Sequence, residues 1–152
     1  KFIVEISRHE YIEGKQTQYV EGYRIFVYSP AMIVGEKLRA ICQQMPEYAS
    51  VIRRTRRGSA RARDFVDIHM LVASQGISMA SPSNRALLEA IFAAKRVPMS
   101  LLEKVREYRE FHRPDFPAVQ ATVKPGLELK EFDFYFDFVA QLAAELYTIG
   151  NE

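Results

Sequence analysis

The chain has 152 residues, 48% of them hydrophobic, and a formal net charge of +2, so it can form one compact core or share a core with a further segment. Its single cysteine, Cys42, excludes an internal disulfide framework. Its apolar runs are shorter than the ~20 consecutive residues of a membrane-spanning helix. We therefore expect a soluble, cytoplasmic protein that has no membrane partner.

Arginine is concentrated in one short stretch of the chain, whereas the end of the chain is rich in aspartate and glutamate. The stretch contains Arg53, Arg54, Arg56, Arg57, Arg61 and Arg63. The net charge is too small to indicate nucleic-acid binding by the whole chain. An anionic ligand is instead expected near these arginines.

The first 28 residues have the pattern of β-strands. The run FIVEIS follows Lys1 directly, and YRIFVY at residues 23–28 is rich in β-branched and aromatic side chains. Turn residues, among them Glu21-Gly22, separate the two runs. We predict two or three strands, and a chain entered partway, because FIVEIS begins without a preceding turn.

Helical periodicity begins after Ser29-Pro30, which supply a capping hydroxyl and a proline suited to a first turn. We predict a helix over about residues 30–45. A second helix is predicted over about residues 60–76, ending at Gly76, which is suited to a left-handed cap.

Further amphipathic helices are predicted after Ser83, after Ser100 and over about residues 131–148. Residues 113–126 contain three prolines and little periodicity, so a loop or extended arm is predicted there. The predicted fold class is therefore α+β, with strands in residues 1–28 and a bundle of about five helices in residues 29–152.

Two charged residues fall on apolar helix faces. At 100° per residue, Lys37 lies among Ile33, Val34, Ala40 and Ile41. Asp64 lies between Ile68 and Leu71, with Asp67 one step further round the helix. An unpaired charge in a dry site costs several kcal/mol, so we predict that Lys37 and Asp64 meet across two packed helices.

These residues lead to two interpretations. In the first, Lys37, Asp64 and Asp67 line a polar cleft where the two helices face the opening strands, with arginines at its rim. In the second, Lys37 extends its ammonium into solvent and Asp64 pairs locally with an arginine. Glu5 shares a strand face with Ile3 and Ser7, so it is either a metal ligand or catalytic base, or a residue on the solvent face of a sheet.

The segment MIVGEKLRAICQQM at residues 32–45, followed by RARDFVDIHML at residues 61–71, resembles the second half of the AbiEii/AbiGii toxin nucleotidyltransferases. The matching elements are Glu36-Lys37 on one helix, and Arg61, Arg63-Asp64 and Asp67 on the next. The resemblance extends from FIVEIS to Leu71.

The resemblance implies a polymerase-β-like nucleotidyltransferase core whose sheet is completed by the opening strands. Such a toxin, from a toxin-antitoxin or abortive-infection system, transfers a nucleoside monophosphate from an NTP to an acceptor such as RNA, with Mg²⁺ as cofactor and a cognate antitoxin as an expected partner. On this match Lys37 contacts the triphosphate, and Asp64 orients the lysine or assists the acceptor. Glu5 lies near the metal, Arg61 and Arg63 hold phosphate or support Asp64, and Asp67 belongs to the substrate site.

The chain departs from the family pattern in one respect. These enzymes hold two Mg²⁺ ions with a D-x-D pair that follows a Gly-Ser turn. Gly58-Ser59 does precede Asp64 and Asp67, but the D-x-x-D spacing on a predicted helix is not that motif. The motif is expected upstream of Lys1, and the 152-residue chain alone is expected to be inactive.

Two alternatives belong to other functional classes. Arg63 and His69 fit the loose R-x(4–6)-H pattern of metal-independent helical ribonucleases, although His69 lies well round the helix from Arg63. A non-catalytic module could also bind RNA or a partner protein through the arginine-rich stretch. The absence of regular aromatic interleaving in that stretch counts against an RNA-stacking platform. His9 and His112 lack metal-ligand spacing and are interpreted as structural.

Overall fold

A computed structural model describes residues 9–124, 126 and 128–149. A two-stranded antiparallel hairpin comes first, with β1 at Gln16–Val20 and β2 at Tyr23–Val27. Val20 pairs with Tyr23, and the two-residue turn between them has positive φ at Glu21 (50°) and Gly22 (85°), as tight hairpins require. The predicted strand after Tyr23 and the predicted turn are confirmed. FIVEIS and Glu5 lie outside the described residues.

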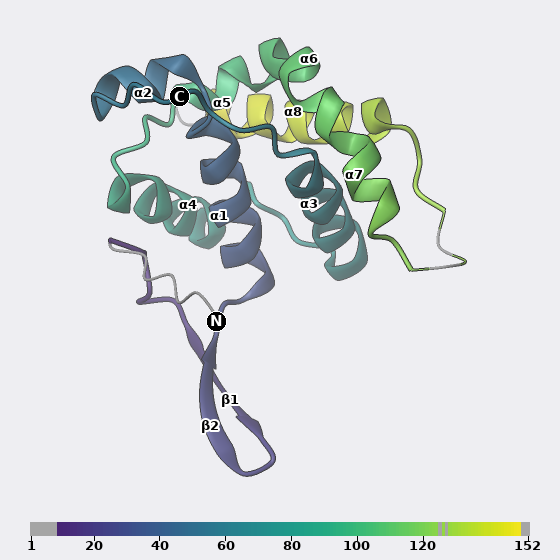
Figure 1. The fold of residues 1–152 in the computed structure, drawn as a ribbon. Coiled ribbons are helices and arrows are strands. Elements are labelled where there is room, and N and C mark those ends of the chain that lie inside the picture. The colour runs from purple at the N-terminus through teal and green to yellow at the C-terminus, as the bar shows by residue number, and fades with distance from the viewer. Residues whose placement is uncertain (1–8, 125, 127, 150–152) are drawn as a thin grey trace, which may run out of the picture.

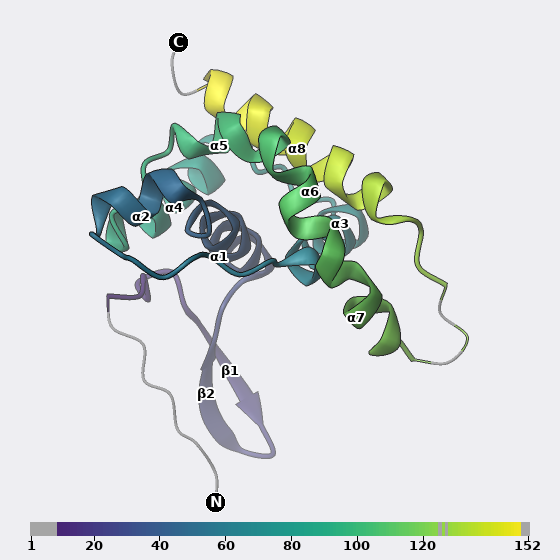
Figure 2. The ribbon, with the colours of Figure 1, turned by 45° about the horizontal axis from the view of Figure 1, so that its top comes forward.

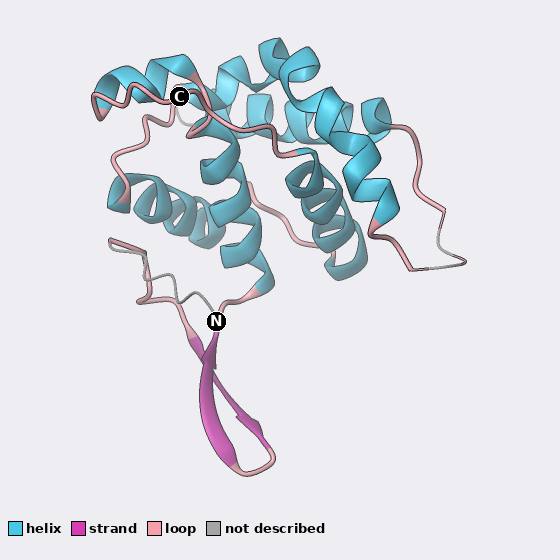
Figure 3. Ribbon diagram, in the orientation of Figure 1, coloured by secondary structure: helices cyan, strands magenta, loops and turns pink. Residues whose placement is uncertain are grey.

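The hairpin projects away from the helices (Figures 1 and 3). Every residue of β1, and every residue of β2 except Val27, is exposed. The exposed side chains include large apolar ones, such as Tyr23 at 76% and Phe26 at 56% exposure. Because these side chains are exposed, the hairpin has little packing from other described residues, and a two-stranded hairpin alone is only marginally stable.

The long helix α1, Pro30–Cys42, occupies the centre of the helical part (Figure 1). The Ser29 hydroxyl accepts a hydrogen bond from the Met32 amide at 3.2 Å, which confirms the predicted cap, and Pro30 occupies the first turn. The predicted helix extended three residues too far, because Gln43 to Met45 form a turn before α2, Pro46–Val51.

Helix α1 packs against α3, Ala62–Gln75, and α4, Pro82–Ala94. Helix α3 ends where predicted, with Gly76 in the left-handed conformation at φ 59°. Gly35 brings α1 close to α4, since a Cβ there would lie 2.8 Å from Ile91 Cδ1. The contacts of α1 with α3 and with α4 therefore determine which face of α1 meets each neighbouring helix.

The final helix, α8 at Phe132–Ile149, lies across α3 and α5 (Figure 2). Phe136 of α8 stacks on Phe65 of α3 with ring centroids 5.2 Å apart, and Phe132 meets the same ring edge-on at 5.7 Å. The aromatic residues that start this helix therefore build a core with α3, as buried aromatic pairs commonly do.

The predicted helix after Ser100 is interrupted. It divides into α5 (Leu101–Lys104), the 3₁₀ turn η1 (Val105–Tyr108) and α6 (Arg109–His112). The predicted loop at residues 113–126 is wrong in its first part. Residues Arg113–Asp115 form the 3₁₀ turn η2, and Phe116–Ala121 form helix α7. Pro114 and Pro117 lie in first turns, where a missing N–H leaves no hydrogen bond unmade.

The predicted α+β class is confirmed, with an N-terminal hairpin followed by helices. The described residues form more helical segments than the five predicted, because the short α2, α5, α6 and α7 connect the long helices. None of the described helices is long and apolar enough to cross a membrane.

Candidate functional site

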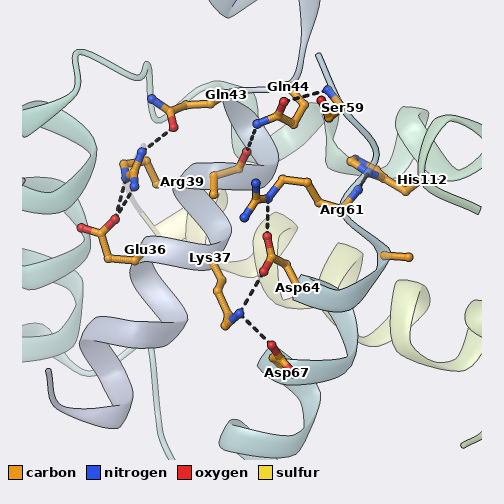
Figure 4. Close-up of polar contacts among 12 residues, drawn as sticks. Glu36, Lys37, Arg39, Gln43, Gln44, Ser59, Arg61, Asp64, Asp67 and His112 are labelled. Carbon is orange, nitrogen blue, oxygen red and sulfur yellow. Dashed lines mark hydrogen bonds and ion pairs between the residues drawn. The ribbon is translucent and has the colours of Figure 1, made fainter. Parts of the chain in front are cut away.

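Lys37 and two aspartates form an ion-pair cluster between α1 and α3 (Figure 4). The Lys37 ammonium donates a hydrogen bond to Asp64 Oδ1 at 2.9 Å and another to Asp67 Oδ2 at 2.8 Å. The predicted contact between Lys37 and Asp64 is therefore confirmed. We call Lys37, Asp64, Asp67, Arg61 and Arg63 the lysine cluster.

Both aspartates face α1 because they stand three residues apart on α3, a spacing that places side chains on one helix face. Asp64 is buried at 4% exposure, whereas the Asp67 side chain is 30% exposed. Lys37 reaches them from the middle of α1 with 22% of its side chain exposed. The cluster thus has a buried end at Asp64 and an accessible end at Asp67.

Two arginines complete the cluster. The Arg61 guanidinium pairs with the second oxygen of Asp64. Arg63 Nε pairs with Asp67 Oδ1 at 3.2 Å, and Arg63 Nη1 donates to the Thr122 hydroxyl at 2.9 Å. All four carboxylate oxygens therefore face a cation, and three positive against two negative groups leave a net charge of +1.

Lys37 remains protonated at neutral pH. Partial burial by itself lowers the Lys37 pKa, but the hydrogen bonds from Lys37 to Asp67 and Asp64 outweigh this effect, and the pKa is raised above its ordinary value. The side chain therefore presents a permanent positive charge at the interface between α1 and α3.

His112 and Asp115 hold the start of α3. The sequence predicted a structural role for His112 without its partner, and did not indicate Asp115. His112 Nδ1 accepts a hydrogen bond from the Arg61 amide at 3.1 Å, and Asp115 Oδ2 accepts one from the Ala62 amide at 3.0 Å. These bonds satisfy amides that the first turn of a helix leaves unpaired. Burial lowers the pKa of His112 to about 4, so the ring is neutral and can accept. More than 50 residues separate the partners of each bond, so local spacing carried no signal.

The other predicted site residues lie elsewhere. Glu36 turns away from Lys37 and pairs with Arg39 on the same helix (Figure 4). Glu5 lies outside the described residues. Of the predicted cleft between helices and opening strands, FIVEIS lies outside the described residues, and β1 and β2 project away from the helices (Figure 1). The charged groups meet within the α1–α3 interface instead.

Arg63 and His69, the pair in the ribonuclease alternative, have separate surroundings. Arg63 contacts Asp67 and Thr122. The His69 ring packs against Phe134 and Phe138 of α8, with centroids 4.9 Å away in each case. This packing does not favour joint action of the two residues on one phosphodiester.

The described residues do not fit a magnesium ion. Mg²⁺ binds carboxylate oxygens that are free to coordinate it, whereas the oxygens of Asp64 and Asp67 all face Lys37, Arg61 or Arg63. Residues 9–124, 126 and 128–149 contain no group of three or more His, Cys, Asp or Glu side chains suited to a metal. We therefore assign no metal-dependent step to these residues.

Comparison with known families gives the class of the chain, a nucleotidyltransferase-like toxin. The matching family is described as "Nucleotidyl transferase AbiEii toxin, Type IV TA system", and its model matches residues 3–138. The match covers most of the chain, so the chain belongs to the AbiEii family. Searches of curated proteins and of solved structures gave no match.

Proposed function

We propose that this chain is the helical part of a toxin that transfers a nucleoside monophosphate from an NTP to an RNA acceptor, and that Lys37 contacts the triphosphate. The observation that carries the proposal is the position of Lys37 between α1 and α3, where its ammonium donates hydrogen bonds to both Asp64 and Asp67. Family membership supports the general class, and the lysine cluster supplies groups suited to phosphate.

Lys37 has a donor to spare for a ligand. A protonated lysine carries three N–H donors. Two of the Lys37 donors form hydrogen bonds, to Asp64 at 2.9 Å and to Asp67 at 2.8 Å. Among the described residues the third donor has no partner. A phosphate oxygen that approached the exposed part of Lys37 would complete its hydrogen bonds, and the cluster's net charge of +1 would attract it.

In the proposed reaction an acceptor hydroxyl of RNA attacks the α-phosphorus of the NTP. The bond to the β-phosphate oxygen breaks, pyrophosphate leaves, and the hydroxyl proton passes to a base or to water. Negative charge grows on the leaving pyrophosphate. A preorganised ammonium stabilises such charge more in the transition state than in the ground state, and this is the role proposed for Lys37.

Asp64 is proposed as a positioning residue. It is 4% exposed and accepts from both Lys37 and Arg61, so it fixes the direction of the ammonium. Asp67 and Arg63 lie at the accessible end of the cluster. We assign them, with Arg61, to substrate binding.

The Mg²⁺ used by nucleotidyltransferases would help to neutralise the triphosphate, but its ligands are not among the described residues. Glu5 is proposed to lie near that metal. A cognate antitoxin is the proposed protein partner, since the family description names a toxin-antitoxin system.

We propose that residues 1–28 complete the sheet of the nucleotidyltransferase core, and that residues 29–152 form the helical domain. The register of the hairpin places Val20, Tyr23, Ile25 and Val27 on one face, together with Gln16 and Gln18. Four of the six residues on this face of the projecting hairpin are therefore apolar or aromatic. Packing that face against a further layer would supply the stabilisation that an isolated hairpin lacks.

The proposal is tested with the complete gene product, Mg²⁺, cellular RNA and each of the four α-³²P-labelled NTPs. We expect label to enter RNA, and the Lys37→Ala variant to lose this incorporation. Lys95→Ala is a matched control, because Lys95 is also ion-paired, to Glu10 at 2.8 Å, and its side chain is similarly exposed at 18%. RNA that shortened without added NTP would instead support a ribonuclease.

A further inference from the structure

A cavity of about 760 Å³ lies between the loop that follows α2 and the segment of η1 and α6. Its lining includes Arg53, Arg54, Arg56 and Arg57 from the loop, and Tyr108 and Phe111 from the opposite segment. No residue of the lysine cluster lines it. The volume is typical of sites that hold one small molecule or one nucleotide-sized group.

The four arginines carry uncompensated charge. None of them forms an ion pair with a carboxylate in the described part of the chain, whereas Arg39, Arg85, Arg109 and others each have one. Two nitrogens of the Arg54 guanidinium, Nε and Nη2, are buried and have no hydrogen-bond partner among the described residues. Buried polar groups are nearly always satisfied, so Arg54 is suited to an anionic ligand.

The opposite wall of the cavity is aromatic. The Tyr108 and Phe111 rings meet edge-to-face with centroids 6.2 Å apart, and the Tyr108 hydroxyl donates to Glu47 Oε2 at 2.8 Å. The first ring is therefore held in place, while Phe111 remains 37% exposed. Sequence reasoning found no aromatic residues interleaved with the arginines, but folding brings these two rings to them from about 50 residues away.

From these observations we propose that the cavity binds single-stranded RNA, with the arginines contacting phosphates and a base stacking on Phe111. Guanidinium groups paired with an exposed ring are the combination by which proteins bind unpaired strands. A duplex keeps its bases stacked inside and offers no base to the ring. The proposal rests on the proposed function in identifying this RNA as the acceptor.

The position of the cavity fits an acceptor site. The loop lines the cavity up to Gly58 and reaches the lysine cluster at Arg61, three residues later, a Cα distance of at most about 11 Å. Gly58 lies close against the turn that follows α1, since a Cβ there would lie 2.1 Å from the Gln44 carbonyl oxygen. The Ser59 amide also donates to Gln44 Oε1 at 2.9 Å. The RNA would thus bind beside the proposed NTP contact.

Binding of a fluorescein-labelled single-stranded RNA to the full chain, followed by anisotropy, tests the proposal. Arg53→Ala should weaken binding and lower the slope of log K against log salt by about 0.7, the value for one lost phosphate contact. Arg96→Ala is the matched control, because Arg53 and Arg96 both have φ of 54° and both are exposed. Any backbone effect of the substitution therefore cancels.

Phe111→Leu should weaken RNA binding by roughly fivefold or more, since stacking contributes about 1–3 kcal/mol per base. Phe134→Leu changes a comparably exposed ring elsewhere, at 47%, and should have no effect. The proposal would be overturned if Arg53→Ala and its control Arg96→Ala, or Phe111→Leu and its control Phe134→Leu, lost RNA affinity equally. Equal affinity for duplex and single-stranded RNA would also overturn it. So would polyglutamate binding that depends equally on Arg53 and Phe111, since that result would indicate an acidic protein partner.

The two proposals fail separately. Lys37→Ala should keep its RNA affinity while losing nucleotide transfer. If the transfer reaction is wrong, Lys37→Ala will have normal activity while RNA binding still depends on Arg53 and Phe111. If the cavity is wrong, Arg53→Ala and Phe111→Leu will bind RNA normally, whatever the outcome for Lys37.

Discussion

The Lys37 ammonium lies 2.9 Å from the Asp64 carboxylate although 27 residues separate them in sequence. We predict that Lys37→Ala lowers nucleotide transfer by the complete gene product about 10²–10³-fold, the usual effect of removing one preorganised charge-stabilising group. The fold should survive, because Asp64 keeps Arg61 as a partner. Turnover and melting temperature are measured on the same preparation. Near-normal turnover with altered stability would contradict the assigned role.

The two aspartates should differ in their effect on stability. Asp64→Ala removes the partner of both Lys37 and Arg61 at a position that is 4% exposed, and we expect a loss of about 1–3 kcal/mol. Asp67→Ala, at a side chain that is 30% exposed, should cost about 0–1 kcal/mol. Urea unfolding of both variants measures the difference. Equal losses would show that burial does not distinguish the two ends of the cluster.

Protonation of His112 should destabilise the chain in acid. Its pKa is lowered from 6.5 to about 4 by burial, so between these values the unfolded chain binds a proton that the folded chain does not. The contribution of His112 is therefore complete above about pH 6.5 and is lost as pH falls toward 4, on the order of 3 kcal/mol in all.

The variant His112→Asn tests this prediction, since an amide oxygen can accept from the Arg61 amide but does not titrate. The substitution also removes ring packing on Phe65, whose centroid lies 5.0 Å from that of His112, so the variant should be less stable at pH 7.5. Its stability should then fall less than that of the wild type between pH 6.5 and 4, as measured by urea unfolding. Parallel pH profiles would exclude His112 as the titrating group.

Gly35 and Ile91 should be energetically coupled. A Cβ at position 35 would lie 2.8 Å from Ile91 Cδ1, so this contact offsets the ~1 kcal/mol that Gly35→Ala would otherwise gain in helix propensity. Ile91→Val removes the Cδ1 atom and should cost about 0.5–1.5 kcal/mol alone. The double variant should be more stable than the sum of the single changes by at least about 0.5 kcal/mol. Additive changes in thermal unfolding would contradict the close contact.

The long helices and the central ion pair could be predicted because the information is local. Ser29, Pro30 and Gly76 mark helix ends by their own chemistry. Lys37 and Asp64 stood out because each interrupts an apolar stripe of its helix, and a buried charge requires a partner. Helical periodicity alone therefore predicts that Lys37 and Asp64 contact each other.

The remaining features depend on tertiary contacts. Three prolines and weak periodicity predict a loop over residues 113–126, although Pro117 in the first turn of α7 is compatible with a helix. His112 reaches Arg61 across 51 residues, and Phe111 reaches the arginine loop only after α6 has packed. No local pattern encodes these approaches, so the support of α3 and the aromatic wall could not be predicted.

The anchoring of Gly58 against Gln44 has a thermodynamic consequence. One loop leads from the arginine-lined cavity to Arg61, so a ligand that fixed the loop at one end would also restrict the conformations of the other end. The second ligand then loses less conformational freedom when it binds, which is positive cooperativity. If NTP and RNA bind at the two proposed sites and either raises the affinity of the other, linkage requires that both affinities rise by the same factor, which favours the complex with both substrates.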